Sequence, residues 1–134
     1  MPAPKPDAPF AYAILRVVPR VERGEQLNVG VVVYCRQHDF LDLRAELDEA
    51  RLAVLAPDLD LADVRASLEA LRAIVCGEPA GGALAQLPPS ERFGWLVAPA
   101  STILQPSEVH TGLTDDPAAT LDRLFDSLVA VAGG

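Results

Sequence analysis

The chain has 134 residues, of which half are hydrophobic and 22% are charged, and its formal net charge is -8. This length suits one domain with one core, and the hydrophobic content excludes a disordered chain. The acidic excess disfavours nucleic acid and anionic lipid as partners, and the apolar runs are too short to cross a membrane. We therefore expect a soluble, cytoplasmic protein.

The N-terminal segment and the two cysteines offer little chemistry. Residues 1–9, "MPAPKPDAP", contain four prolines and no apolar signal-peptide stretch, so they are expected to form a flexible tail. The remainder, residues 10–134, is expected to form a single domain. The two cysteines, Cys35 and Cys76, cannot complete a zinc site by themselves, so structural thiols without a metal or cofactor are expected.

The N-terminal third predicts three strands. Residues 10–18 are apolar on both faces, which is typical of a strand covered on both sides, and Arg16 lies among the apolar side chains of one face. Residues 27–36 predict a central strand, and residues 40–47 alternate as a half-exposed strand does. Short polar connections between these segments predict a three-stranded antiparallel meander.

The second strand has two faces if its side chains alternate strictly. One face then carries Leu27, Val29, Val31, Val33 and Cys35, and Asn28 and Gly30 belong to the other. A glycine inside a strand indicates a bulge or the close approach of another group. The ring of Trp95 is one group that we expect near Gly30.

The rest of the chain predicts helices and a late extended segment. Apolar residues at spacings of three and four, with Asp, Pro and Gly at the ends, indicate helices at residues 48–58, 60–76, 90–98 and 116–131. Residues 77–89 are rich in Gly and Pro and are expected to be a loop. Residues 101–112 predict one or two extended pieces interrupted by Pro106. The expected fold class is α+β, an antiparallel sheet with helices packed on it.

The charged connection after the first strand is the first candidate site. It contains Arg20, Glu22, Arg23 and Glu25, and Asn28 follows it. Arginines offer forked donors that suit a small anion or a peptide, and Glu25 and Asn28 can orient such a ligand. The alternative is a solvated turn with local ion pairs, which contribute little to stability.

Arg16 is the second candidate, because its strand position directs a charge into an apolar face. It either pairs with a buried carboxylate for structural reasons or lines the floor of a pocket. Arg92 and Trp95, three residues apart, lie near one helical face and suit a planar or anionic ligand. The alternative places Trp95 in the core, with Arg92 reaching solvent beside it.

His110 is the stronger of the two histidine candidates. Ser107 and Glu108 are close to it in sequence, but their spacing is not diagnostic of a catalytic triad, and a hydrogen-bonded strand histidine is the simpler interpretation. An enzyme or small-anion binder would need four residues to converge around one cleft: Arg16, Asn28, Arg92 and His110.

Two stretches, "YAILRVVPRVERGEQLNVGVVVY" and "ERFGWLVAPASTILQPSEVHTGLTDDPAATLDRLFDSLV", resemble the bacterial family catalogued as domain of unknown function 3037. The resemblance covers the N-terminal hairpin and the C-terminal third, about half of the chain. It implies no activity and no catalytic residues. Such proteins are often encoded beside a kinase-like protein that resembles HipA, so the resemblance implies a partner or regulator of that kinase. The leading hypothesis is a small accessory or binding module, capable of homo-oligomer formation, that engages a protein partner.

Overall fold

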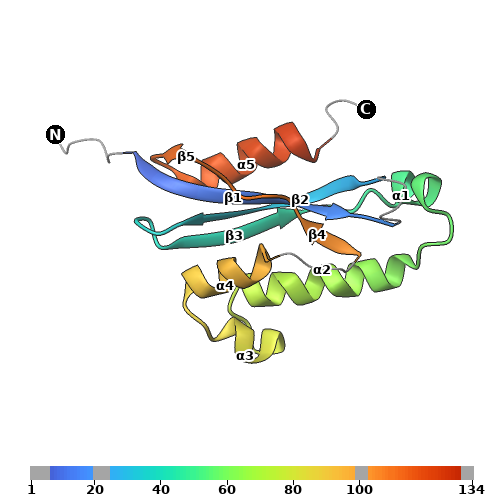
Figure 1. Cartoon of the computed structure of the whole chain (residues 1–134), viewed down its shortest axis with the longest axis horizontal. Helices are drawn as coiled ribbons and strands as arrows, with labels where there is room; N and C mark the ends of the chain where they lie inside the picture. The colour runs from blue at the N-terminus through green and yellow to red at the C-terminus, as the bar shows by residue number, and fades with distance from the viewer. Residues whose placement is uncertain (1–6, 20–24, 99–102, 131–134) are drawn as a thin grey trace.

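A computed structural model describes residues 7–19, 25–98 and 103–130 of the chain. In this part of the chain an antiparallel sheet of five strands lies between helices on its two faces (Figure 1). The fold is therefore α+β, as the sequence predicts. The strands are β1 (Ala8–Val17), β2 (Leu27–Cys35), β3 (Phe40–Ala45), β4 (Leu104–Pro106) and β5 (His110–Thr114).

The strand order confirms the expected meander of the first three strands. The sheet runs β3-β2-β1-β4, and β5 also pairs with β1. Strand β4 pairs with the C-terminal end of β1, at residues 15–17, and β5 pairs with its N-terminal half, at residues 8–12. Strand β1 begins at Ala8, so the last two residues of the expected tail belong to the sheet. Residues 1–6 lie outside the described ranges.

Helices cover both faces of the sheet. Helix α5 (Pro117–Leu128) lies on one face, and α2 (Leu61–Val75), α3 (Gly82–Ala85) and α4 (Pro89–Leu96) lie on the other, whereas α1 (Glu49–Leu55) lies at one end (Figure 1). Asp60 and Asp116 cap α2 and α5 as expected, because their side chains accept backbone N–H groups of the first turns of these helices. Asp48 does the same for α1.

The sheet has an apolar core on each face, which explains why β1 and β2 are apolar on both sides. The core under α2 and α4 includes Leu15, Val32, Leu43, Val64 and Phe93. The core under α5 includes Phe10, Val31, Val33, Cys35 and Leu121. Strands buried on both faces lose the usual alternation of polar and apolar residues.

Strict alternation along β2 is wrong, because a bulge shifts its register. Leu15 pairs with Gly30, whereas the next residue, Arg16, pairs with Asn28. Val29 is therefore an extra residue, and it packs in the core under α2 and not beside Val31. Asn28 is turned to the α5 face, where its side chain reaches that helix. The bulge thus places Asn28 on the same face as Arg16.

Gly30 marks the bulge and a close approach, as expected, but the neighbouring group is not the ring of Trp95. A Cβ atom added at Gly30 would lie 2.9 Å from the Cβ of Ala45 and 3.2 Å from the backbone oxygen of Arg44. The glycine therefore lets β3 lie close against β2.

The Gly- and Pro-rich segment 77–89 is more ordered than a loop. It contains a 3-10 turn at Pro79–Gly81 and the short helix α3. Gly77 and Gly82 have positive φ angles of 70° and 67°, which favour glycine. Ala85 of α3 is buried, and α3 packs against the 3-10 turn and α2.

Candidate functional site

Arg16 lies at the centre of a polar row that crosses three strands. Its direct neighbours are Asn28 in β2 and Gln105 in β4. The Nε atom of Arg16 donates to Oδ1 of Asn28 over 3.4 Å, which is long for a hydrogen bond. Among the described contacts, the hydrogen-bond partner of the half-buried guanidinium is an amide.

Asn28 connects this row to the end of α5. Its Nδ2 atom donates to the backbone oxygen of Leu128, the last residue of the helix, over 3.0 Å. The C-terminal end of a helix carries partial negative charge, so the cationic Arg16 nearby is electrostatically favourable. The Arg16–Asn28 pair thus helps to hold α5 on the sheet.

Three adjoining hollows lie at the same end of the molecule, among the described residues. A polar hollow of about 220 Å³ is lined by Leu27, Asn28, Glu46, Asp48, Arg51, Val129 and Ala130. An apolar hollow of about 500 Å³ is lined by Gln26, Leu27, Ala50, Arg51, Val54 and Leu55. A third, of about 170 Å³, is lined by Pro19, Glu25 and residues 55–59. The surface formed by these lining residues is called the α1 end.

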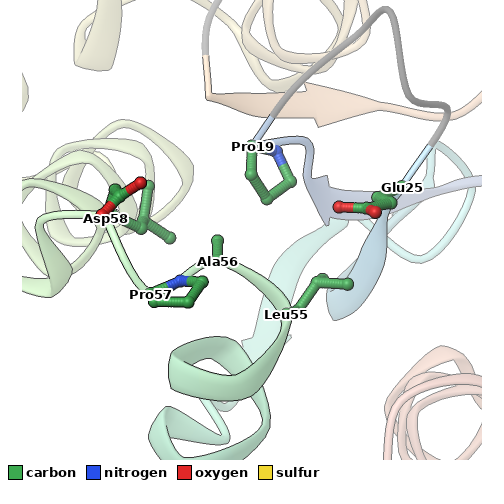
Figure 2. A pocket seen from close by; sticks show the side chains of 7 residues that line it. Pro19, Glu25, Leu55, Ala56, Pro57 and Asp58 are labelled. Carbon is green, nitrogen blue, oxygen red and sulfur yellow. The ribbon is translucent and has the colours of Figure 1, made fainter.

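The third hollow lies between the sheet and the segment after α1. Figure 2 shows Pro19 and Glu25 on the side of the strands, and Leu55, Ala56 and Asp58 across from them. Glu25 is thus the described member of the charged connection that lines a hollow. Arg20, Glu22 and Arg23 lie outside the described residues, and so does Val131 at the end of the expected C-terminal helix.

The apolar hollow has an exposed residue in its lining. Val54 of α1 is 84% exposed, although Leu52 on the same helix is fully buried. Leu55 and Leu27 line the same hollow and are partly buried. Contiguous apolar groups on a surface mark interaction sites, whereas single exposed apolar residues are ordinary. Val54 belongs to the first kind, because it adjoins Leu27 and Leu55 in the lining of the hollow.

Arg92 has a different environment from the one expected. Its Nη1 atom donates to the backbone oxygens of Ile74, over 3.2 Å, and Val75, over 2.8 Å. These carbonyls belong to the last turn of α2, so Arg92 caps that helix and does not reach into solvent. Its Nε atom is buried without a described hydrogen-bond partner.

Trp95 is not the core residue of α4. It is 47% exposed, whereas Phe93 and Leu96 are buried. The ring of Phe93 stacks on that of Tyr34 in β2, with centroids 5.5 Å apart. The alternative that placed Trp95 in the core is therefore wrong, and Phe93 has that position.

His110 packs on a neighbouring strand. It is paired with Tyr12 across β5 and β1, and the two ring centroids are 5.2 Å apart. The hydroxyl of Ser107 accepts from the backbone N–H of Ile14 and donates to the backbone oxygen of Glu108. This serine is thus engaged by the backbone, and the structure shows no catalytic pair of Ser107 and His110 in the described ranges.

The four residues proposed for one cleft are not brought together. Arg16 and Asn28 lie on the face that α5 covers, whereas Arg92 is bonded to α2 on the opposite face (Figure 1). His110 pairs with the N-terminal half of β1, and Arg16 lies four residues farther along. The sheet thus separates Arg92 from Arg16 and Asn28, and His110 is set apart from them by its position along β1.

The sequence indicates only part of the α1 end. A helix at residues 48–58 is expected from the pattern, but Arg51 and Val54 are not distinguished by it. The sequence does show that one apolar residue of α1 must be exposed. Leu52 and Val54 are two positions apart, so they cannot lie on the same face of the helix. Which of them is buried depends on the position of α1 at the end of the sheet.

The two thiols are in different environments. Cys35 is fully buried and its Sγ donates to the backbone oxygen of Pro9, whereas Cys76 is exposed. Partial burial, and then the negative charges of Asp42 and Glu78, raise the pKa of the Cys76 thiol. No group of three or more potential metal ligands occurs in the ranges that the structure describes.

The family comparison covers most of the chain. Residues 12–129 match the model of the family described as "Protein of unknown function (DUF3037)", and the chain belongs to that family. The match includes the middle helices, beyond the half of the chain that carries the resemblance. No curated protein and no solved structure matched the chain. Among the described residues, no helix has the length and apolar character needed to cross a membrane.

Proposed function

We propose that this member of the family is a protein-binding module, and that its α1 end contacts the partner. The observation that carries the proposal is Val54, which is 84% exposed in the lining of the apolar hollow of about 500 Å³. Burial of one apolar side chain contributes about 1.5–3 kcal/mol to association. A partner that binds here would bury the side chain of Val54 and place an apolar group of its own in the hollow.

The surroundings of the hollow have the composition of an interface. Protein interfaces combine a central apolar patch with a polar rim. At the α1 end, Glu46, Asp48 and Arg51 line the polar hollow, which adjoins the apolar one through Leu27 and Arg51. The partner is therefore expected to insert an apolar side chain into the apolar hollow. Around that side chain it would carry groups of both charge signs, which face Glu46, Asp48 and Arg51.

The kinase-like protein that resembles HipA is the proposed partner. The identity of this partner rests on the family resemblance alone. The region of contact, the α1 end, is proposed from the structure. The direct experiment is co-expression of the full chain with the neighbouring kinase-like protein, followed by affinity purification through a tag on either one. Stoichiometric co-purification supports the proposal. Clean separation of the two proteins in low and moderate salt would count against this partner.

A charge at Val54 tests the contact region. Val54→Lys is expected to weaken the complex at least about tenfold, because it places a charge in the apolar part of the interface. Leu113→Lys is the matched control, since Leu113 is also exposed but lies on β5 at the other end of the molecule (Figure 1). A complex that tolerates Val54→Lys and is lost with Leu113→Lys would place the contact at β5 instead.

A further inference from the structure

Strand β5 is an edge of the sheet. It pairs with β1, and none of the described strands pairs with its other side. Its sequence, "HTGLT", contains no Asp, Glu, Lys, Arg or Pro. Edge strands usually carry such residues because an open edge can pair with another chain. The opposite edge, β3, has them in Asp42 and Arg44.

The open edge also exposes apolar side chains. Leu113 is 66% exposed and Val109, which directly precedes β5, is 43% exposed. Val109 directly precedes the first residue of β5, and continuing the pleat of the strand by this one residue directs both side chains to the same face of the sheet. On the other face Gly112 lies against the ring of Phe10, which packs in the core under α5. One face of the edge is therefore packed and the other carries uncovered apolar groups.

We propose that a second copy of this chain pairs with β5, antiparallel, around a two-fold axis at Thr111. Val109 of each copy then lies opposite Leu113 of the other, and both exposed apolar residues are covered by this one contact. His110 lies opposite Gly112, which has no side chain to oppose the imidazole. The two sheets join into one continuous sheet across the dimer.

The pairing of apolar residues selects this register over its neighbours. A two-fold axis normal to the sheet pairs each residue with one of the same face, so the centre can move only by whole residues. An axis at Gly112 would place Leu113 opposite Thr111 and Val109 opposite Asp115, so neither apolar residue would meet another. An axis at His110 would place Leu113 opposite Ser107 and leave Val109 opposite Thr111. The axis at Thr111 alone among the three pairs apolar with apolar residues.

The contact is short, so the dimer is weak. Stable protein interfaces bury roughly 1,600 Å² in total, and one short strand pairing covers less than that. Each copy carries a formal net charge of -8, so the two copies repel at long range. Salt screens this repulsion, and dimer formation is therefore expected to strengthen with added salt.

Cysteine cross-linking tests the register. In a Cys76→Ser background, Thr111→Cys places two thiols opposite each other across the axis, where Cβ atoms of paired strand residues lie about 4.5–5.5 Å apart. Mild oxidation is expected to give a covalent dimer. Leu113→Cys is the control, because the two Leu113 positions lie roughly four residues apart along the strands, about 14 Å. Equal cross-linking of both variants, or none of Thr111→Cys, overturns the proposed pairing.

Sedimentation equilibrium of the full chain provides the second measurement. The expected result is a monomer–dimer equilibrium that shifts toward dimer with concentration and salt. Leu113→Lys is expected to abolish it, since the charge would be buried against Val109 of the second copy. Val54→Lys, at the α1 end, is expected to leave it unchanged, so failure of dimerisation and failure of partner binding are distinguishable. A chain that stays monomeric at millimolar concentration in high salt overturns the proposal.

Discussion

Ser107 takes the place of a strand residue opposite Ile14. Its backbone N–H donates to the oxygen of Ile14 over 2.7 Å, and its side-chain oxygen accepts from the N–H of Ile14 over 2.8 Å. Strands β4 and β5 are interrupted at residues 107–109, so no backbone oxygen is in place for that N–H. The hydroxyl of Ser107 thus accepts the hydrogen bond of the Ile14 N–H at the point where the strands beside β1 are interrupted.

Replacing Ser107 with alanine is expected to destabilise the fold. Ser107→Ala leaves the buried N–H of Ile14 without an acceptor, and an unsatisfied buried donor costs about 1–3 kcal/mol. Urea denaturation measures the loss. Ser127→Ala, at an exposed position of α5, is the control and is expected to change stability by less than about 0.5 kcal/mol. Equal stabilities for the two variants would mean that Ser107 is dispensable.

A methyl group at Gly30 is expected to disturb the contact of β2 with β3. Gly30→Ala would bring a Cβ within 2.9 Å of the Cβ of Ala45, so the strands must separate, at a cost of about 1–3 kcal/mol. The matched control is Gly94→Ala, because no atom lies within 4 Å of the added Cβ on α4. There alanine is expected to stabilise the helix by roughly 0.5–1 kcal/mol. Thermal unfolding of both variants shows whether the signs are opposite.

Arg92 is expected to contribute to stability and not to binding. Arg92→Met keeps the aliphatic chain but removes the bonds to the oxygens of Ile74 and Val75, which lowers the free energy of unfolding by about 1–3 kcal/mol. Arg92→Lys retains a charge at the helix end and is expected to lose less. Denaturant titration is the measurement. An Arg92→Met chain as stable as the original, but unable to bind its partner, would reverse this assignment.

The Cys76 thiol is expected to react at higher pH than an ordinary thiol. Its pKa is raised by partial burial and by the charges of Asp42 and Glu78, and the thiolate is the reactive form. The pH midpoint of its alkylation rate is therefore expected to lie above that of the urea-unfolded chain. Glu78→Gln removes one of the negative charges and is expected to lower the midpoint. Identical midpoints in the folded and unfolded chain would contradict the raised pKa.

Local patterns in the sequence were sufficient for much of the fold. The meander follows from apolar strands separated by short polar turns, and the starts of α2 and α5 follow from Asp60 and Asp116. These features depend on neighbours within a few residues, so they can be predicted without knowledge of the tertiary structure.

The candidate site was less predictable, since its members depend on contacts between distant segments. Arg16 and Arg92 are both arginines next to apolar residues, yet one contacts Asn28 beside α5 and the other caps α2 on the opposite face. Trp95 and Phe93 are equally plausible core residues until α4 is placed, and Phe93 then meets Tyr34.

By itself the sequence determined the strands, the helix starts and the α+β class, because hydrophobic period and capping are short-range properties. The tertiary structure alone decided that Asn28 lies on the α5 face, that Val54 is exposed and that β5 is an open edge. Each of these depends on how distant segments pair and pack. A shift of one residue in strand register turns a side chain from one face of the sheet to the other.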